Sequence, residues 1–228
     1  MIQRKDWDSD FFGISIGEIA GSSPCFTGLD EYDLVQVCPN IVDDPIDVYI
    51  SHGFKYVDLR MSFQKNVVSC KRPSNESIWV NPDANCITQK DIHELADGLC
   101  LFSRFSQMPI EKKRVGHFYR TWLQKALDRQ FDNFSMFIRG FDEVVGVITA
   151  LITNESCRIG LVAVKERYRG KGYGHMLLEA FESCLFDSGI KYVSVVTEGR
   201  NIAAQRLYQK AGFTTYEICM WLYHEKHN

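Results

Sequence analysis

An apolar segment, a basic turn rich in glycine and a helix follow one another without a break between residues 161 and 178. The segment Leu161–Val164 has the apolar character of a buried strand, and the turn opens directly into a helix expected over residues 172–188. Glycine recurs at alternate positions of the turn, at Gly170, Gly172 and Gly174. Because glycine has no side chain, backbone N–H groups of the turn and of the first helical turn can point together at an anion. The pattern predicts a pyrophosphate-binding unit.

The charge of this turn agrees with an anionic ligand. The turn contains four basic residues and one acidic residue, Glu166; the basic residues are Lys165, Arg167, Arg169 and Lys171. The whole chain has a formal net charge of −3. The positive charge is therefore local to the turn.

Spacing distinguishes among the known phosphate-binding loops. A P-loop needs Ser or Thr after its Gly-Lys pair, but Gly170-Lys171 is followed by Gly172. A dinucleotide fingerprint needs glycine where this chain has His175. The string Arg169–Gly174 fits [QR]-x-x-G-x-[GA], and it resembles the acetyl-CoA pyrophosphate loop of the GNAT family of acetyltransferases. The alternative interpretation is an ordinary turn between a strand and a helix, in which the glycines have no ligand-binding role.

A second motif, in register behind the first, favours the GNAT interpretation. A strand expected over residues 192–197 leads into a helix that begins near Asn201 and ends at Gly212. Asn201, Ala204 and Tyr208 lie at i, i+3 and i+7, and so on one face of that helix. In the GNAT family the matching Asn binds the cofactor, the small residue lets pantetheine pass, and the Tyr lies beside the sulfur. A tyrosine that only closes a helix edge is the alternative for Tyr208.

The resemblance implies acetyl-CoA as co-substrate and direct transfer of its acetyl group. Tyr208 is the implied catalytic acid, because a phenol of reference pKa about 10 can donate to a thiolate of reference pKa about 8.5. The implied cofactor-binding residues are Val162, Ala163, Val164, Arg169, Gly170, Lys171, Gly172, Tyr173, Gly174, Asn201 and Ala204. The strand residues among them would pair with pantetheine and supply the oxyanion donor. The general base stays open between Glu198, Glu155 and a chain of water molecules.

Composition and charge exclude several other classes. The chain has 228 residues, of which 45% are hydrophobic, so it can bury a core of one large or two small domains. A pI near 6.1 shows no excess of basic residues of the kind that binds nucleic acid or an anionic membrane. The segment Met1–Asp8 has no signal-peptide core, and no apolar run approaches the ~20 residues that span a bilayer. We expect a cytoplasmic protein with no nucleic-acid or membrane partner.

The cysteines and histidines predict neither disulfides nor a metal site. The 8 cysteines are scattered without a C-x-x-C pair, and the 6 histidines form no H-x-x-x-H pair. In a chain without a secretory signal, this pattern is typical of reduced thiols. We therefore expect no bound metal.

The GNAT-like pattern occupies residues 87–228. Helices are expected over 88–102 and 111–127, and strands over 134–139, 144–153 and 215–223, with a turn at residues 140–143. Strands alternating with helices in this order predict an α/β fold with a GNAT-type mixed sheet flanked by helices.

Residues 1–80 repeat part of the C-terminal half. At an offset of 159 residues, Tyr208, Gly212, Phe213, Ile218, Met220 and Leu222 fall on Tyr49, Gly53, Phe54, Leu59, Met61 and Phe63. The repeat predicts a smaller, truncated GNAT-like α/β domain ahead of the catalytic one. It has no glycine-rich basic turn, so Tyr49 is not expected to serve a cofactor. Coincidence is the alternative, since a glycine cap before a strand is common.

Further stretches resemble the TDP-fucosamine acetyltransferases and their relatives: Trp7–Gly13, Gly53–Asp58, Phe118–Trp122, Val196–Asn201 and Trp221–His224. Such enzymes acetylate the amine of a nucleotide-linked deoxyamino sugar, which implies a role in cell-surface polysaccharide biosynthesis. Glu198 departs from the resemblance, because Gln is expected there. The aromatic residues also suit a protein core, and this is the preferred interpretation for Trp7, Phe11, Phe12 and Trp122.

Two other functions stay open. A GNAT enzyme can act on a protein N-terminus, a lysine or a polyamine, and a degenerate domain can bind acetyl-CoA without turnover. A polyamine site would favour clustered acids, whereas the diphosphate of a nucleotide sugar calls for Arg or Lys. The sequence leaves open the sugar, its nucleotide, the reacting amine and the oligomeric state, with a homodimer as one option.

Overall fold

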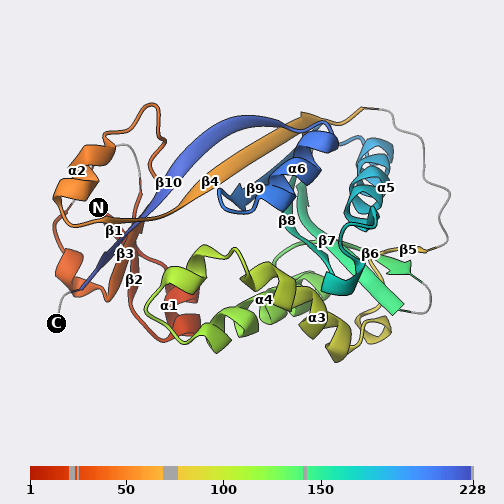
Figure 1. The fold of residues 1–228 in the computed structure, drawn as a ribbon, viewed down its shortest axis with the longest axis horizontal. Helices are drawn as coiled ribbons and strands as arrows, with labels where there is room; N and C mark the ends of the chain where they lie inside the picture. The colour runs from red at the N-terminus through yellow and green to blue at the C-terminus, as the bar shows by residue number, and fades with distance from the viewer. Residues whose placement is uncertain (21–23, 25, 69–76, 141–142, 227–228) are drawn as a thin grey trace.

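A computed structural model describes residues 1–20, 24, 26–68, 77–140 and 143–226 of the chain. Its strands are β1 (Ile2–Arg4), β2 (Ile16–Ile19), β3 (Leu34–Val37), β4 (Lys55–Asn66), β5 (Ile78–Val80), β6 (Phe134–Gly140), β7 (Glu143–Thr153), β8 (Ser156–Val164), β9 (Tyr192–Glu198) and β10 (Thr214–Glu225). They form one mixed sheet in the order β1-β2-β3-β10-β4-β9-β8-β7-β6-β5. Figure 1 shows the long β4 and β10 crossing from one half of the molecule to the other.

Helices flank the sheet on both faces (Figure 1). They are α1 (Asp6–Phe12), α2 (Ile46–Ser51), α3 (Gln89–Cys100), α4 (Lys112–Leu127), α5 (Tyr173–Asp187) and α6 (Ile202–Lys210), with short 3-10 helices η1 (Leu29–Glu31), η2 (Ala84–Cys86), η3 (Arg104–Gln107) and η4 (Glu166–Tyr168). The predicted mixed α/β fold is confirmed, with element ends within a few residues of those expected. Residues 141–142 of the expected hairpin turn lie outside the described residues. No helix within the described ranges combines the length and apolar character needed to cross a bilayer.

Of the three apolar cores that the described residues form, the two larger ones lie on opposite faces of the sheet. On one face, helices α5 and α6 pack through Leu177, Phe181 and Tyr208. On the other, α1, α3 and α4 pack around Phe118, whose ring stacks on Phe12 with centroids 5.4 Å apart. This second cluster contains the aromatic residues that the sequence favours as core residues: Trp7, Phe11, Phe12 and Trp122. Burial of apolar surface on both faces therefore fixes the sheet between two helical layers.

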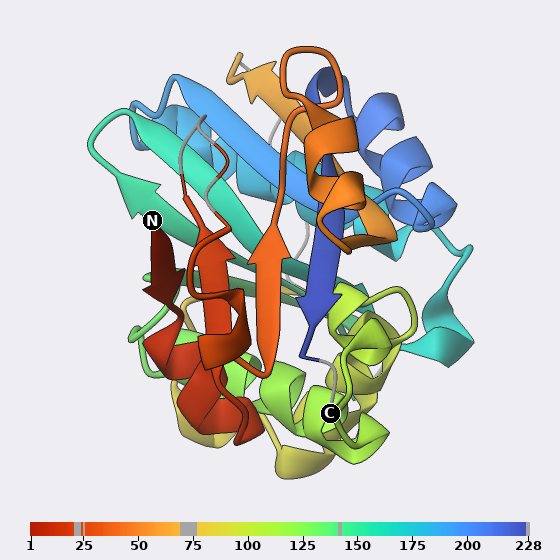
Figure 2. The same ribbon diagram turned by 90° about the vertical axis from the view of Figure 1, so that its left-hand side faces the viewer.

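The N-terminal and C-terminal parts exchange strands. β4 pairs with β9 and β10, whereas β10 pairs with β3 as well as with β4. Figure 2 shows the blue β10 beside the orange β3. The unit β3-α2-β4 corresponds to β9-α6-β10 at the offset of 159 residues, with Gly53 and Gly212 both at a φ of 85° after the helix. This arrangement supports the predicted N-terminal domain of residues 1–80, which stays a prediction, while the sheet itself is continuous across both parts.

β8 and β9 separate after the first three residues of each strand. The two parallel strands pair only from Ser156–Arg158 to Tyr192–Ser194. Just beyond this point β8 carries a bulge, because Thr149 pairs with Leu161 and Ala150 with Ile159, which leaves Gly160 without a partner. A Cβ on Gly160 would overlap the buried carboxylate of Asp132. Only glycine fits this bulge, and the gap between the separating strands opens a cavity.

Candidate active site

A cavity of about 670 Å³ lies in the gap between β8 and β9. Its walls also include the start of α5, the side of α6, and residues of η3 and β10. The predicted site residues that line it are Val162, Ala163, Val164, Arg169, Gly170, Gly172, Tyr173, Gly174, Asn201, Ala204 and Tyr208. Lys171 is the exception, and its ammonium lies 5.1 Å from the centroid of the Tyr168 ring.

The glycine-rich turn has the backbone conformation that only glycine adopts without strain. Gly170 and Gly172 have φ values of 73° and 89°, and Gly172 caps the N-terminus of α5. No atom lies within 4 Å of the position that a Cβ on either residue would take. The glycines therefore leave space for a ligand beside the N-terminus of α5. This is the geometry that binds a pyrophosphate through N–H groups and the helix dipole.

Arg169 lies across the mouth of this turn. Its Nε donates a hydrogen bond to the carbonyl oxygen of Val164 at 3.1 Å, and its guanidinium packs against Gly98 of α3. A Cβ on Gly98 would overlap that guanidinium. The small residue in α3 thus leaves room for the arginine, and both residues line the cavity.

Tyr208 of α6 forms part of the cavity wall. Its ring packs between Phe63 and Phe213, with centroids 5.7 and 5.8 Å away, and the residue is only 4% exposed. Burial raises the pKa of the Tyr208 phenol, and the nearby Glu198 raises it further. The phenol is therefore protonated and neutral at physiological pH and has an O–H to donate, while the raised pKa makes it a weaker acid than an exposed tyrosine.

Asn201 has a structural role beside its predicted one. Its side-chain oxygen accepts the backbone N–H of Ala204 at 3.2 Å and so caps the N-terminus of α6. Its amide nitrogen remains as the group for a ligand. Ala204, one turn before Tyr208, adds little bulk to the same wall.

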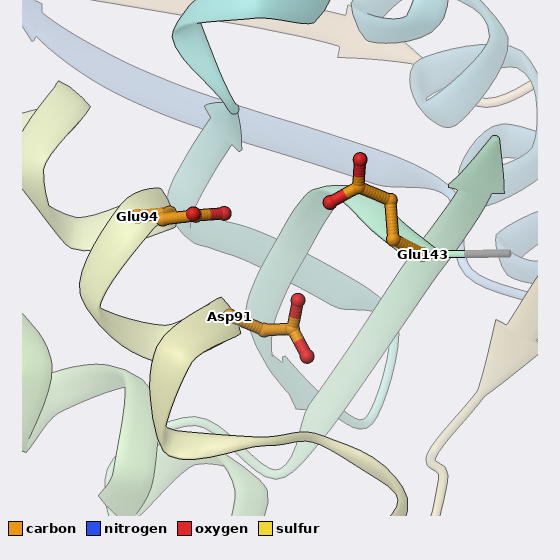
Figure 3. Close-up of side chains that lie close together, drawn as sticks. All are labelled: Asp91, Glu94 and Glu143. Atoms are coloured by element: carbon orange, nitrogen blue, oxygen red, sulfur yellow. The ribbon is translucent and has the colours of Figure 1, made fainter.

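A buried ion-pair cluster holds the turn to the rest of the fold. The Lys165 ammonium, on a side chain 1% exposed, lies 2.6 Å from Asp91, 2.9 Å from Glu94 and 3.2 Å from Glu143. Figure 3 shows these three carboxylates converging from α3 and from the start of β7. Arg167 also binds Glu94 and Glu143. Three carboxylates this close could hold a metal ion, but the cation that they hold in the structure is the lysine.

The far end of the cavity is basic and aromatic. Arg104 of η3 stacks on Trp221, with its guanidinium carbon 3.8 Å from the ring centroid. Its NH1 donates to Gln36 at 2.9 Å and to the hydroxyl of Tyr223. Arg60 of β4 reaches the same end and pairs with Glu217 at 2.9 Å. Neither arginine carries a spacing signal in the sequence, since long-range strand pairing and a single 3-10 turn bring them there.

Comparison with known proteins relates this architecture to a protein family. Residues 103–213, which include the strand, the glycine-rich turn and the Tyr208 helix, match the acetyltransferase (GNAT) family. The chain carries a GNAT acetyltransferase domain. The predicted family and enzyme class are thereby confirmed.

Relatives of the GNAT domain extend over most of the chain. The chain is 24% identical to dTDP-fucosamine acetyltransferase of Escherichia coli O6:H1, over 97% of each chain. It is 27% identical to the spore coat polysaccharide biosynthesis protein SpsD of Bacillus subtilis, over 58% of this chain and 46% of that protein.

Solved structures agree on the fold. A GCN5-related N-acetyltransferase from Sphaerobacter thermophilus aligns with a TM-score of 0.57 and 18% identity, over 86% of this chain and only 60% of that one. A tandem GNAT protein from the clavulanic acid biosynthesis pathway aligns over 94% of this chain and 78% of its own, with a TM-score of 0.56 and 10% identity.

The structure distinguishes between the two acidic residues that the sequence suggests as the general base, Glu155 and Glu198. Glu155 lies in the turn between β7 and β8, where its carboxylate is 66% exposed and pairs with Lys191 at 2.9 Å. Glu198, at the end of β9, lines the cavity, and burial raises its pKa. Of the two, only Glu198 can meet a ligand in the cavity.

No disulfide joins the cysteines of the described residues, which are Cys38, Cys86, Cys100, Cys157, Cys184 and Cys219. Cys25 and Cys70 lie outside the described residues. None of the six lines the cavity, so they take no part in the chemistry derived from it.

Proposed function

We propose that this acetyltransferase transfers the acetyl group of acetyl-CoA to the amine of a nucleotide-linked deoxyamino sugar, with a TDP sugar as the expected class. The observation that carries the proposal is that one cavity joins two different halves. One half holds the glycine-rich turn and Tyr208, and the other holds Arg60, Arg104 and Trp221. The cavity thus has a half for each of two substrates, and the second half suits an anionic, ring-containing acceptor.

The cofactor half supplies what a thioester donor needs. Backbone N–H groups at the start of α5 would bind the pyrophosphate. The β8 edge from Leu161 to Val164 lies beyond its pairing with β9, so its backbone groups can bind pantetheine and the thioester oxygen. Tyr208 would protonate the departing thiolate. Arg169, Asn201 and Ala204 complete the wall along which the cofactor would lie.

The acceptor half is built by both parts of the chain. Arg60 comes from the N-terminal part, while Arg104 and Trp221 come from the catalytic part. Arginine binds phosphate oxygens through its planar fork of N–H donors, and aromatic rings bind sugar and base faces. The names of two relatives, a dTDP-fucosamine acetyltransferase and a spore coat polysaccharide biosynthesis protein, support the same substrate class and a role in cell-surface polysaccharide synthesis. The N-terminal part would therefore complete the acceptor site rather than bind CoA.

The other candidate functions receive less support. A polyamine acceptor would call for several carboxylates, whereas Glu198 is the one carboxylate among the described residues that line the cavity. A module that only binds acetyl-CoA would have no use for a buried, neutral phenol in the wall of the cavity.

The deciding experiment measures release of free CoA thiol from acetyl-CoA with a panel of acceptors. The panel contains TDP-linked and UDP-linked amino sugars, free amino sugars, peptides and polyamines. We expect turnover with a nucleotide-linked amino sugar, competition by the free nucleoside diphosphate, and weaker binding as salt rises. Efficient acetylation of peptides or polyamines with no turnover of any amino-sugar nucleotide would favour the alternative acceptor. Binding of acetyl-CoA without any turnover would favour the non-catalytic module.

A further inference from the structure

Glu198 stands apart from the other carboxylates near the active site. Asp91, Glu94 and Glu143 each lie within 3.2 Å of the Lys165 ammonium, and Glu217 pairs with Arg60. Among the described residues, no Lys, Arg or His forms a salt bridge with Glu198. One of its oxygens accepts a long hydrogen bond, 3.4 Å, from the backbone N–H of Arg104. The carboxylate is therefore held in position while most of its capacity to accept hydrogen bonds remains available to a ligand.

The position of Glu198 places its carboxylate between the two halves of the cavity. It ends β9, on the wall that faces β8, and it lies opposite Arg60 in the β4–β9 pairing. It is close enough to Tyr208 and to Tyr119 for its charge to raise the pKa of each phenol. An acceptor amine has to sit between the thioester and the arginines, which is the region that Glu198 borders.

We propose that Glu198 is the general base that deprotonates the acceptor amine, an assignment that rests on the proposed acetyl transfer. The amine arrives mainly as an ammonium ion, which has no lone pair for attack. The carboxylate takes one of its protons, directly or through one water molecule, and later releases that proton to solvent.

The remaining steps balance without any further reagent. The amine nitrogen forms a bond to the thioester carbonyl carbon, and collapse of the tetrahedral intermediate breaks the carbon–sulfur bond. Tyr208 donates its proton to the thiolate, and the phenolate is reprotonated by the second proton that leaves the nitrogen. The products are the acetamide, free CoA thiol and the one proton carried away by Glu198.

Burial makes the Glu198 carboxylate a stronger base than an exposed glutamate. Removal of the carboxylate from water disfavours its charged form, so burial raises the pKa of Glu198 above its usual value. The nearby Asp58 charge adds to this rise, whereas the charge of Arg104 and hydrogen bonds from backbone N–H groups oppose it without reversing it. A base works best when its pKa lies near the working pH. The same shift has a cost in stability: because folding raises this pKa, the ionised carboxylate destabilises the folded chain once the pH exceeds the unfolded value. A purely structural role would have the opposite sign.

The test compares Glu198→Gln with wild-type enzyme over pH 6 to 10. Gln keeps the volume of Glu and one oxygen acceptor but cannot take a proton. We expect kcat/KM for the acceptor to fall about 100-fold at neutral pH and to recover as the pH approaches the pKa of the free amine. The KM for acetyl-CoA should stay unchanged, and the melting temperature at pH 7 should not fall. Glu155→Gln, which removes the exposed acid of the β7–β8 turn, is the matched control and should retain the wild-type profile.

The outcomes separate this assignment from the proposed substrate. The comparison is made with whichever amine the wild-type enzyme acetylates, so an unexpected acceptor overturns the substrate class and still tests the base. A Glu198→Gln enzyme with a wild-type pH profile overturns the base. An equal decrease in kcat/KM at every pH also overturns the assignment of Glu198 as the base, and it assigns Glu198 to substrate binding instead.

Discussion

Arg60 of β4 lies directly opposite Cys219 of β10, and the two residues are separated by the same 159 positions that relate the two halves of the sequence. Antiparallel strands related by such an offset meet at a single pair of equivalent residues, which marks a local two-fold axis. Each half therefore gives its last strand to the sheet of the other. As a result, the N-terminal part contributes Arg60 to a cavity otherwise built by the catalytic part.

Gly172→Val is expected to weaken acetyl-CoA binding at least tenfold, or about 1.4 kcal/mol. Gly172 has a φ of 89°, and a branched side chain would project into the open space where the backbone is expected to meet phosphate. Gly189→Val is the matched control, since Gly189 has a φ of 73° and open space around it but lies beyond the other end of α5. Both changes should cost roughly 1–2 kcal/mol of stability through backbone strain. Calorimetry on the two folded variants separates strain from binding, and equal affinities would contradict the assignment.

Local patterns could predict the elements that carry the cofactor site. The strand, turn and helix around Gly172, and the helix from Asn201 to Gly212, are each encoded within one continuous stretch of sequence by apolar spacing and capping glycines. The acceptor half could not be predicted in this way. Arg60 reaches it because β4 inserts between β9 and β10, and its partner Glu217 is 157 residues away. No local pattern specifies pairing over that distance.

The cluster around Lys165 shows the same limit. The lysine stands out in the sequence only as one of several cations in the basic turn, and yet it is the most buried of them. Its partners come from α3 and β7, 74 and 22 residues away in the sequence for Asp91 and Glu143. The role of a charged residue in a turn therefore depends on tertiary contacts that its neighbours in sequence do not reveal.

Arg104→Met should raise the KM for the nucleotide-linked acceptor about tenfold and leave the KM for acetyl-CoA unchanged. Met keeps much of the contact with Trp221 but removes the positive charge, so the salt dependence of acceptor binding should also decrease. Loss of the hydrogen bonds to Gln36 and Tyr223 is expected to lower stability by roughly 1–3 kcal/mol. Arg206→Met, on the exposed side of α6, is the control. An unchanged acceptor KM in the folded Arg104→Met enzyme would remove the arginine from the site.

In the Glu143→Gln variant, the melting temperature should fall less steeply than in the wild-type protein as the pH is lowered. A hydrogen bond from the Tyr168 hydroxyl, together with Arg167, lowers the pKa of Glu143 to about 2. Because the folded chain binds this proton more weakly than the unfolded chain, the contribution is complete above pH ~4.5 and is lost as the pH falls toward about 2. Melting temperatures measured from pH 7 to pH 3 give the comparison. Parallel curves for the variant and the wild-type protein would show that the ion pair does not contribute to folding.

Tyr208→Phe should lower kcat by ~10²–10⁴-fold with little change in acetyl-CoA affinity. The change removes one hydroxyl, while the contacts of the ring with Phe63 and Phe213 remain, so the fold should persist. Tyr49→Phe is the matched control, because Tyr49 occupies the equivalent place in the N-terminal half and packs there against Phe54 away from the cavity. It should turn over at the wild-type rate. If chemistry limits the rate and Tyr208→Phe stays within about threefold of wild type, Tyr208 is a core residue and the proton comes from elsewhere.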